Sequence, residues 1–198
     1  MNLIPLRTPT DPSKAKHKSS LYDPYYKSMF WATETLNKNG IVAFVINNSW
    51  IHNSIADAFR TFLTTQYSQI YLVDLQGDIR KARFDKGNNS EGENVFGQNS
   101  QNGIVIAIMI KNGNNDDCKI SYAEIGESLP TMHKLSKLAD WGSVNTIKSK
   151  GLFKPIKPST HADWINPRIV TGDHIFRIGD KSREKLFIFF IPPISMNP

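Results

Sequence analysis

The chain has 198 residues, of which 39% are hydrophobic and 11% aromatic, a composition typical of a globular protein rather than a disordered one. Its longest apolar run, residues 104–110, is far too short to cross a bilayer, and the N-terminus lacks the features of a secretory signal, so we expect a cytoplasmic protein with no membrane part. Lys and Arg number 24 against 18 Asp and Glu, and the resulting charge of +6 favours a polyanionic partner such as nucleic acid without proving it.

Cysteine and histidine usage argues against disulfide and metal chemistry. Cys118 is the single cysteine, which excludes an intramolecular disulfide and leaves too few sulfur ligands for a cysteine-based zinc site. We expect its thiol to be unreactive. The histidines form no H-x-x-x-H or carboxylate-spaced pattern, so we predict no metal site.

The chain begins with an irregular stretch and continues with an amphipathic helix. Residues 1–20 are rich in Pro, Thr, Ser and Lys without periodicity, which predicts an extended N-terminal arm. A helix is predicted to follow Asp23, because Pro24 suits a first turn, and to end at Asn39-Gly40. The residues expected on its buried face are Tyr26, Met29, Phe30, Thr33 and Leu36.

The segment GIVAFVINNSW, residues 40–50, contains six consecutive apolar residues. Such a run at 41–46 predicts a strand that is buried on both faces, as in the middle of a parallel sheet between helical layers. A helix is predicted over residues 49–67 and a second strand over 69–75. The rhythm of strand, helix and strand predicts an α/β fold in which the sheet is parallel at this point.

A long polar, glycine-rich segment at 76–102 precedes a third apolar strand at 103–110. Connections of this length are usually functional or disordered. Further on, the sequence predicts a short strand at 118–125 and a helix at 130–142. The Lys- and Pro-rich remainder, from about residue 148, gives no clear prediction.

Polar residues follow the first strand, at the place where α/β sheets bind ligands. Asn47, Asn48 and Ser49 could hydrogen-bond a ligand or cap the next helix, and spacing alone favours capping. Trp50 could stack on a base, although a Trp beside a strand end more often packs in the core.

The second strand and the long segment hold further candidates. Asp74 and Asp78 could form a catalytic carboxylate pair or simply a turn. Phe84 and Phe96 either anchor the segment to the body or are free to contact a planar ligand. The segment also has four cationic side chains within seven residues, at Arg80, Lys81, Arg83 and Lys86. Such a cluster could contact phosphates, but it is equally typical of a solvated loop.

Four segments, in order, resemble the later part of the catalytic domain of N6-adenine DNA methyltransferases, especially those fused into large restriction–modification polypeptides. They are AKHKSSLYDPYYKSMFWATETL, GIVAFVINNSWI, IYLVDLQGDIRK and ENVFGQNSQNGIVIAIMIK, and HADWINPR resembles a W-[IL]-N-x-R element beyond that domain. The resemblance implies a partial Rossmann-like class I methyltransferase fold, with the later strands of the sheet and their flanking helices. It divides the chain into an arm (1–20), the C-terminal half of a catalytic domain (21–112) and an irregular extension (113–198).

The resemblance also implies roles for the candidate residues. Asn47, Asn48 and Ser49 would line or shape the pocket that receives the extruded adenine, while also capping the helix. Phe96, in the matching N-V-F-G, would stack on the base or form the pocket wall. The four cations of the long segment would contact the DNA backbone.

Two motifs of that family are absent from this sequence: the glycine-containing loop that binds S-adenosylmethionine and the catalytic N-P-P-[YFW] turn. The resemblance therefore implies a fragment or split subunit that acts on DNA when an upstream polypeptide supplies the cofactor half, and that neither binds S-adenosylmethionine nor transfers methyl groups alone. A sheet halved at its centre would expose an apolar edge. The competing class is a non-catalytic DNA-binding module, and a stand-alone enzyme with an unrecognised cofactor site is third.

Overall fold

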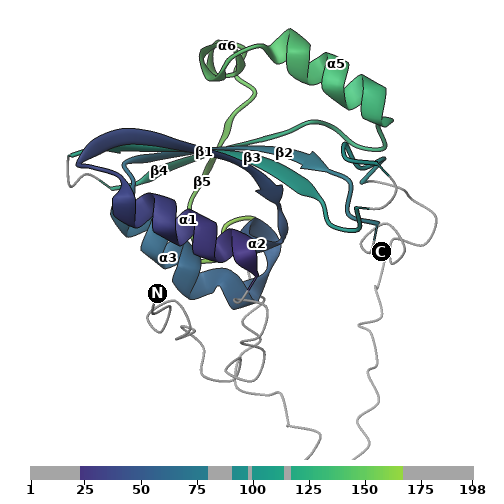
Figure 1. Ribbon diagram of the computed structural model, residues 1–198. Helices are drawn as coiled ribbons and strands as arrows, with labels where there is room; N and C mark the ends of the chain where they lie inside the picture. Colours follow the sequence, from purple (N-terminus) through teal and green to yellow (C-terminus); the bar gives the residue numbers. More distant parts are fainter. Residues whose placement is uncertain (1–22, 80–90, 98–99, 114–116, 167–198) are drawn as a thin grey trace, which may run out of the picture. The chain divides into compact units, whose positions relative to one another are not determined.

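A computed structural model of the protein describes residues 23–79, 91–97, 100–113 and 117–166, all of which belong to one structural unit. These residues form a five-stranded sheet with helices on both faces (Figure 1), which confirms the predicted α/β class. The predicted arm, residues 1–20, lies outside the described residues. No helix in the described ranges is both long and apolar enough to cross a membrane.

The sheet has the strand order β1-β3-β2-β4-β5. The strands are β1 (Asn39–Asn47), β2 (Gln69–Gln76), β3 (Ile104–Asn112), β4 (Lys119–Glu124) and β5 (Lys154–Ile156). The helices are α1 (Pro24–Thr35), α2 (Ser49–His52), the 3-10 helix η3 (Ser54–Ala56), α3 (Asp57–Gln66), α5 (Thr131–Trp141) and α6 (Val144–Ser149).

The sheet is mixed, so the prediction of a parallel sheet at this point is wrong. β3 lies between β1 and β2 and is antiparallel to both, because the strand that follows the long segment inserts between the first two. The parallel pair among the described strands is β2 with β4. β1 and β2 nevertheless run in the same direction, so their carboxyl ends lie at the same end of the sheet.

β1 is an edge strand, and the prediction that it is buried on both faces is wrong. Val42, Phe44 and Ile46 pack against the core on one face, whereas Ile41 and Val45 on the other face are 64% and 53% exposed. A continuous apolar run normally marks a strand with a neighbour on each side and a layer on each face. Among the described residues, β1 has a neighbouring strand on one side only, and helices cover only one of its two faces.

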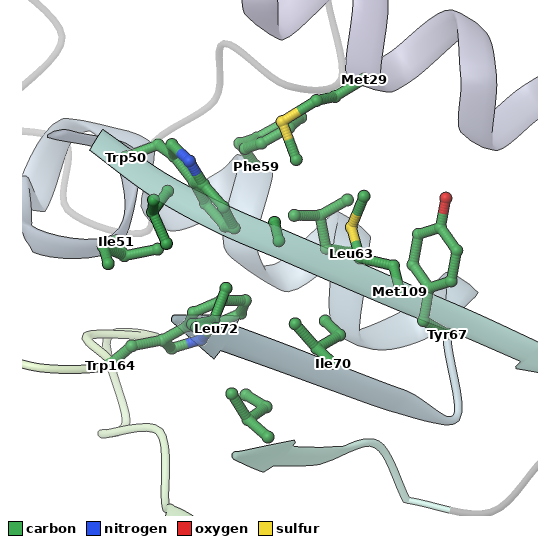
Figure 2. Close-up of a cluster of buried hydrophobic side chains, with 14 of the residues drawn as sticks. Met29, Trp50, Ile51, Phe59, Leu63, Tyr67, Ile70, Leu72, Met109 and Trp164 are labelled. Atoms are coloured by element: carbon green, nitrogen blue, oxygen red, sulfur yellow. The ribbon is translucent and has the colours of Figure 1, made fainter. Parts of the chain in front are cut away.

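One face of the sheet is covered by α1, α2 and α3, and the cluster of buried side chains beneath them is called the first core (Figure 2). Figure 2 labels Met29, Trp50, Ile51, Phe59, Leu63, Tyr67, Ile70, Leu72, Met109 and Trp164. Trp50 is fully buried and makes edge-on contacts with Phe59 and Trp164. It is therefore a core residue rather than a base-stacking one.

The helix predicted over residues 49–67 is interrupted. Asn53 has an extended backbone (φ −82°, ψ 132°), and its side-chain oxygen accepts a hydrogen bond from the Ile55 N–H at 3.1 Å. This cap begins η3, which leads directly into α3. Three short helical pieces thus replace the single predicted helix.

The other face is covered by α5 and α6, and the cluster beneath them is called the second core. Its buried members are Val73, Leu75, Ile104, Ala123, Ile125, Trp141 and Ile147. The predicted helix at 130–142 is confirmed as α5, which ends at Gly142, where φ is +65°. Because β4 pairs with β2, residues beyond the predicted boundary at 112 continue the same sheet.

Lys134 fastens α5 to the sheet. Its side chain is fully buried, and Nζ donates hydrogen bonds to the carbonyls of Leu75 at 2.8 Å and Glu91 at 2.7 Å. Burial lowers the pKa of Lys134, although neighbouring carboxylates oppose this shift. The lysine thereby joins the end of β2 to the described part of the long segment.

Candidate functional site

Asp74 is the centre of a buried polar cluster at the carboxyl ends of β1 and β2. It is 1% exposed, and its Oδ1 accepts hydrogen bonds from Asn48 Nδ2 and from the Gln76 N–H, each at 2.9 Å. Oδ2 accepts a hydrogen bond from the Tyr122 hydroxyl at 3.1 Å and lies 2.9 Å from His52 Nε2. A buried carboxylate needs such partners, because each unmatched charge or donor is costly inside a protein.

The cluster keeps Asp74 ionised. Burial alone would raise the pKa of Asp74, but the hydrogen bond and charge of His52 and the hydrogen bonds from Asn48 and Gln76 bring it below its ordinary value. Burial and the adjacent Asp74 raise the pKa of Tyr122, so the phenol stays protonated and able to donate. Asp74 is therefore a fixed negative charge to which the surrounding donors are aimed.

His52 connects this cluster to the surface. Its Nδ1 lies 3.4 Å from Asn166 Nδ2, while its Nε2 faces Asp74. The two ring nitrogens thus face a carboxylate and a side-chain amide, which fixes the orientation of the ring from both sides. The side chain is 14% exposed, so the imidazole edge remains accessible to a ligand at this end of the sheet.

The three predicted strand-end residues have three different roles in the structure. Asn47 Oδ1 accepts a hydrogen bond from the Ser49 N–H at 2.7 Å, which forms a local turn just before α2, whose N-cap residue Asn48 makes no side-chain capping bond. Asn48 is 2% exposed, and its side chain is held by Asp74. Ser49 Oγ lies 3.3 Å from the Tyr25 hydroxyl. Asn47 and Ser49 are half-buried, so they are the members of this trio that a ligand can reach.

Gly103 packs against Asn48 from the start of β3. The Asn48 N–H donates to the Gly103 carbonyl at 2.8 Å. A Cβ at position 103 would lie 2.7 Å from Asn48 Oδ1 and still closer to Nδ2. Such distances are too short for a real contact, so only glycine allows Asn48 to reach Asp74.

We therefore expect Gly103→Ala to lower the free energy of unfolding by about 1–3 kcal/mol, since it overpacks the site and separates Asn48 from Asp74. Urea denaturation measures this change. The matched control is Gly103→Ala in an Asn48→Ala background, where the clash is absent and the added cost is expected to be small. Equal costs in both backgrounds would contradict the steric explanation.

The described part of the long segment is organised by Asn94. Its Nδ2 donates to the carbonyls of Gly77 at 3.0 Å and Asn102 at 2.7 Å, and its Oδ1 accepts from the Phe96 N–H at 2.9 Å. Val95 packs against the second core, whereas Phe96 belongs to neither core and is 65% exposed. Phe96 is thus presented to solvent on a hydrogen-bonded turn rather than used to anchor the segment.

The remaining residues that the sequence analysis named are not brought together with Asp74 among the described residues. Arg80, Lys81, Arg83, Lys86 and Phe84 lie outside the described residues, so their assignment to DNA contacts stays a prediction. The backbone N–H of Asp78 donates to Glu91 Oε2 at 3.2 Å. Burial raises the pKa of the Cys118 thiol to about 11, which agrees with an unreactive cysteine. In the described ranges, no group of three potential ligands is placed to hold a metal ion.

Arg60 is a site-supporting residue that the sequence analysis missed. It is 1% exposed and donates through Nη1 to the carbonyls of Trp50 at 2.8 Å and Asn53 at 2.6 Å. Its other donors reach the carbonyl of Ala162 and the carboxylate of Asp163, which lies 3.2 Å away. Arg60 thereby fixes the HADW element beside α2, and the resemblance of that element to a family motif was the signal that could have pointed to it.

Three grooves on the described surface are open to small molecules. One of about 380 Å³ is polar and lined by residues including Lys38, Ser68 and Lys111, and one of about 230 Å³ lies beside Tyr71 and Phe153. The third, also about 380 Å³, lies between α1 and β1. Nucleoside sites commonly place an acidic side chain beside an apolar pocket. None of these three grooves has an acidic side chain in its lining.

The solved structures that are similar to this chain include the following three. The ATP-dependent Type ISP restriction–modification enzyme LlaBIII bound to DNA is 32% identical over 90% of this chain, with a TM-score of 0.76. A nuclease-deletion mutant of the Type ISP restriction–modification enzyme LlaGI, in complex with a DNA substrate mimic, is 31% identical over 83%, with a TM-score of 0.71. A DrdV–DNA complex is 29% identical over 75%, with a TM-score of 0.63.

These similarities concern one segment of much longer proteins. The matched part is 12% of the LlaBIII chain, 15% of the LlaGI chain and 14% of the DrdV chain. No protein-family model and no curated protein matches this chain. In fold and in about a third of the aligned residues, the chain is therefore similar to a segment of Type ISP restriction–modification enzymes.

Proposed function

We propose that this chain is the later-strand part of an N6-adenine DNA methyltransferase of a restriction–modification system, and that a second polypeptide carries the cofactor-binding part. The observation that carries the proposal is the 32% identity over 90% of the chain to LlaBIII, a DNA-bound restriction–modification enzyme. The methyltransferase assignment is supported by the motif-like segments, whose polar residues lie at the carboxyl ends of β1 and β2.

The arrangement of the strand ends suits an extruded base. Asn47 and Ser49 are accessible hydrogen-bonding groups, and Phe96 is an accessible aromatic ring on a nearby turn. The turn and the strand end are linked, because Asn94 holds the Asn102 carbonyl and the next residue, Gly103, accepts the Asn48 N–H. An adenine placed here would stack on the ring and donate its amino hydrogens to side-chain oxygens.

The second polypeptide would hold S-adenosylmethionine, which supplies the methyl group when it is bound. The three grooves lack the side chains that a nucleoside-containing cofactor needs, and the glycine-containing loop is absent from the sequence. The described residues that line these three grooves therefore do not fit the cofactor. In this proposal, the part of the chain is to orient the target base and to keep the strand ends rigid.

Co-expression with the polypeptide encoded immediately upstream tests the proposal. Labelled S-adenosylmethionine and duplex DNA should yield labelled adenine only when both polypeptides are present. Label transfer by this chain alone would contradict the split arrangement. A monodisperse, folded complex that transfers no label to DNA would contradict the methyltransferase assignment.

Phe96→Ala is expected to weaken binding of the complex to DNA with a mispaired target adenine by about 5- to 150-fold, because stacking of one base on an aromatic ring contributes about 1–3 kcal/mol. Fluorescence anisotropy with labelled duplexes measures this change. Phe96→Trp should retain affinity, and Met132→Ala, which removes another exposed side chain, on α5, should have no effect. Unchanged affinity of Phe96→Ala would remove the ring from the base pocket.

A non-catalytic DNA-binding module is the second candidate, favoured by the net charge of +6 and by the DNA-bound state of the similar structures. A monodisperse chain that binds DNA alone, with an affinity that falls steeply as salt rises, would support it. Absence of such binding, together with label transfer by the two-polypeptide complex, would favour the methyltransferase.

A further inference from the structure

A narrow groove lies where α6 and the turn after it meet the starts of β2 and β4. Its volume is about 230 Å³, and it is lined by Gln69, Tyr71, Lys119, Ser121, Lys148 and Phe153. Gln69 is the first residue of β2, whereas Asp74 lies near the other end of that strand. No member of the Asp74 cluster lines the groove, which is therefore separate from the proposed target-base site.

Two aromatic rings, those of Tyr71 and Phe153, form one wall of the groove. Their centroids are 5.2 Å apart, their planes are inclined by 51°, and both side chains are half-buried. Gly151 ends α6 in the left-handed conformation, with φ at +66°, and its N–H donates to the Lys148 carbonyl at 3.0 Å. The chain thereby turns back to the sheet, continues as β5 beside β4, and brings Phe153 against Tyr71.

Lys119 and Lys148 give the groove a positive charge. Both are exposed, and neither forms a salt bridge within the part of the chain that the structure describes. Residues 144–162 contain four lysines and neither Asp nor Glu. Exposed lysines alone are typical of a solvated surface. Beside paired aromatic rings, however, they match a nucleotide, whose phosphates need cations and whose base needs a planar partner.

The size and polarity of the groove indicate which nucleotide it suits. Ligand pockets commonly have volumes of about 300–1,000 Å³, so this groove accommodates one base-sized ring rather than a whole cofactor. The acidic side chain that commonly binds a ribose hydroxyl is absent from its lining. A deoxynucleotide does not need that side chain, because its sugar lacks the 2′-hydroxyl, and a carboxylate would repel its phosphates.

We propose that this groove binds one unpaired nucleotide of a single DNA strand. Its base lies against the Phe153 ring, and the neighbouring phosphates contact Lys119 and Lys148. The strand is single because a base within a duplex is stacked on its neighbours and cannot present its face to a protein ring. The choice of DNA agrees with the proposed function and rests on it in part, whereas the site itself is independent of the target-base pocket.

The first test measures binding of the full chain to a labelled single-stranded oligothymidylate by fluorescence anisotropy. In Lys119→Gln, Lys148→Gln, binding should weaken, and the slope of log affinity against log salt should fall by about 1.4, because each phosphate contact to a single strand contributes about 0.7. The matched control is Lys27→Gln, Lys38→Gln, which removes the same charge from exposed positions outside the groove and should leave the slope unchanged. An equal fall in both variants would overturn the proposal.

Phe153→Leu tests the aromatic wall. Leucine keeps an apolar contact with the second core but removes the ring, so affinity for the oligonucleotide should fall at least about fivefold. Phe153→Trp should retain the affinity. Circular dichroism establishes that both variants are folded, and unchanged affinity of folded Phe153→Leu would overturn the placement of the base.

Photo-crosslinking of the unaltered chain gives an answer that does not depend on any variant. A strand that carries iodouracil should crosslink to Tyr71 or Phe153, and mass spectrometry of the peptides locates the attachment. Crosslinks confined to other residues would overturn the proposal. Thymidine monophosphate that competes as effectively as the oligonucleotide would overturn the strand as the ligand, and tighter binding of an RNA strand would overturn the choice of DNA.

Two further outcomes separate this inference from the proposed function. Strand binding that is lost in Lys119→Gln, Lys148→Gln, in a chain whose complex with the upstream polypeptide transfers no label to DNA, would support the groove and remove the methyltransferase assignment. Label transfer by a complex in which the groove does not bind the oligonucleotide would overturn the groove alone.

Discussion

Replacing Asp74 with alanine is expected to lower the free energy of unfolding by about 3–5 kcal/mol, because several buried donors lose their acceptor and each unsatisfied buried group costs about 1–3 kcal/mol. The substitution leaves the donors of Asn48, Gln76 and Tyr122 without their acceptor and leaves His52 without its carboxylate. Urea denaturation measures the loss. Asp140→Ala, at an exposed position of α5, is the control and should change stability by less than about 0.5 kcal/mol.

The ionisation of Asp74 should also make the stability of the fold depend on pH. The pKa of Asp74 in the folded protein lies below its ordinary value of about 3.9. Its ionisation therefore stabilises the fold fully above about pH 4, and this contribution is lost as the pH falls through the folded-state pKa. The stability gap between the unaltered protein and Asp74→Asn should narrow below pH 4. A gap that stays constant down to pH 2 would show that hydrogen bonding alone, without the charge, accounts for it.

Local patterns explain which parts of the fold could be predicted. Helix α1 and strands β1 to β4 follow from periodicity and apolar runs, because both signals are contained within a few neighbouring residues. Neither periodicity nor an apolar run specifies the order of the strands in the sheet. The antiparallel insertion of β3 between β1 and β2 depends on the path of the chain after residue 76, and no short-range pattern encodes that path.

The polar cluster around Asp74 likewise has features that local sequence predicts and features that depend on the folded chain. The position of Asn48 at a strand end could be predicted, but its role depends on Asp74, which is 26 residues away, and on the close approach of Gly103. Asp74 itself could be noted only as a possible turn residue, since burial and its donors are properties of the folded chain. The apolar pattern of β1 predicted an interior strand, whereas the described residues leave β1 at the edge of the sheet with Ile41 and Val45 exposed.

Arg60 shows why long-range clamps escape sequence analysis. A single arginine in an amphipathic helix ordinarily reads as a solvent-facing residue. Here it is buried because its guanidinium meets groups more than 100 residues further along the chain, at Ala162 and Asp163. The planar fork of donors satisfies carbonyls from α2 and the HADW element at once, which a lysine could not do.

Arg60→Met should accordingly be one of the most destabilising substitutions, with a loss of about 3–5 kcal/mol, because it leaves the buried Asp163 carboxylate and three carbonyls without this donor. Trp164, whose ring lies 5.5 Å from that of Trp50, should become accessible as the HADW element loosens. A red shift in tryptophan emission, measured with urea denaturation, reports both effects.

Adding Asp163→Asn to Arg60→Met should restore part of the stability, since the carboxylate that has lost the guanidinium is then replaced by a neutral amide. Arg60→Lys should fall between the unaltered protein and Arg60→Met, because it keeps the charge but loses the fork. If Arg60→Met unfolds at the same urea concentration as the unaltered protein, the guanidinium contributes no net stability. The HADW element would then be held beside α2 by the packing of Trp164 on Trp50 alone, and the strand-end cluster would not depend on Arg60.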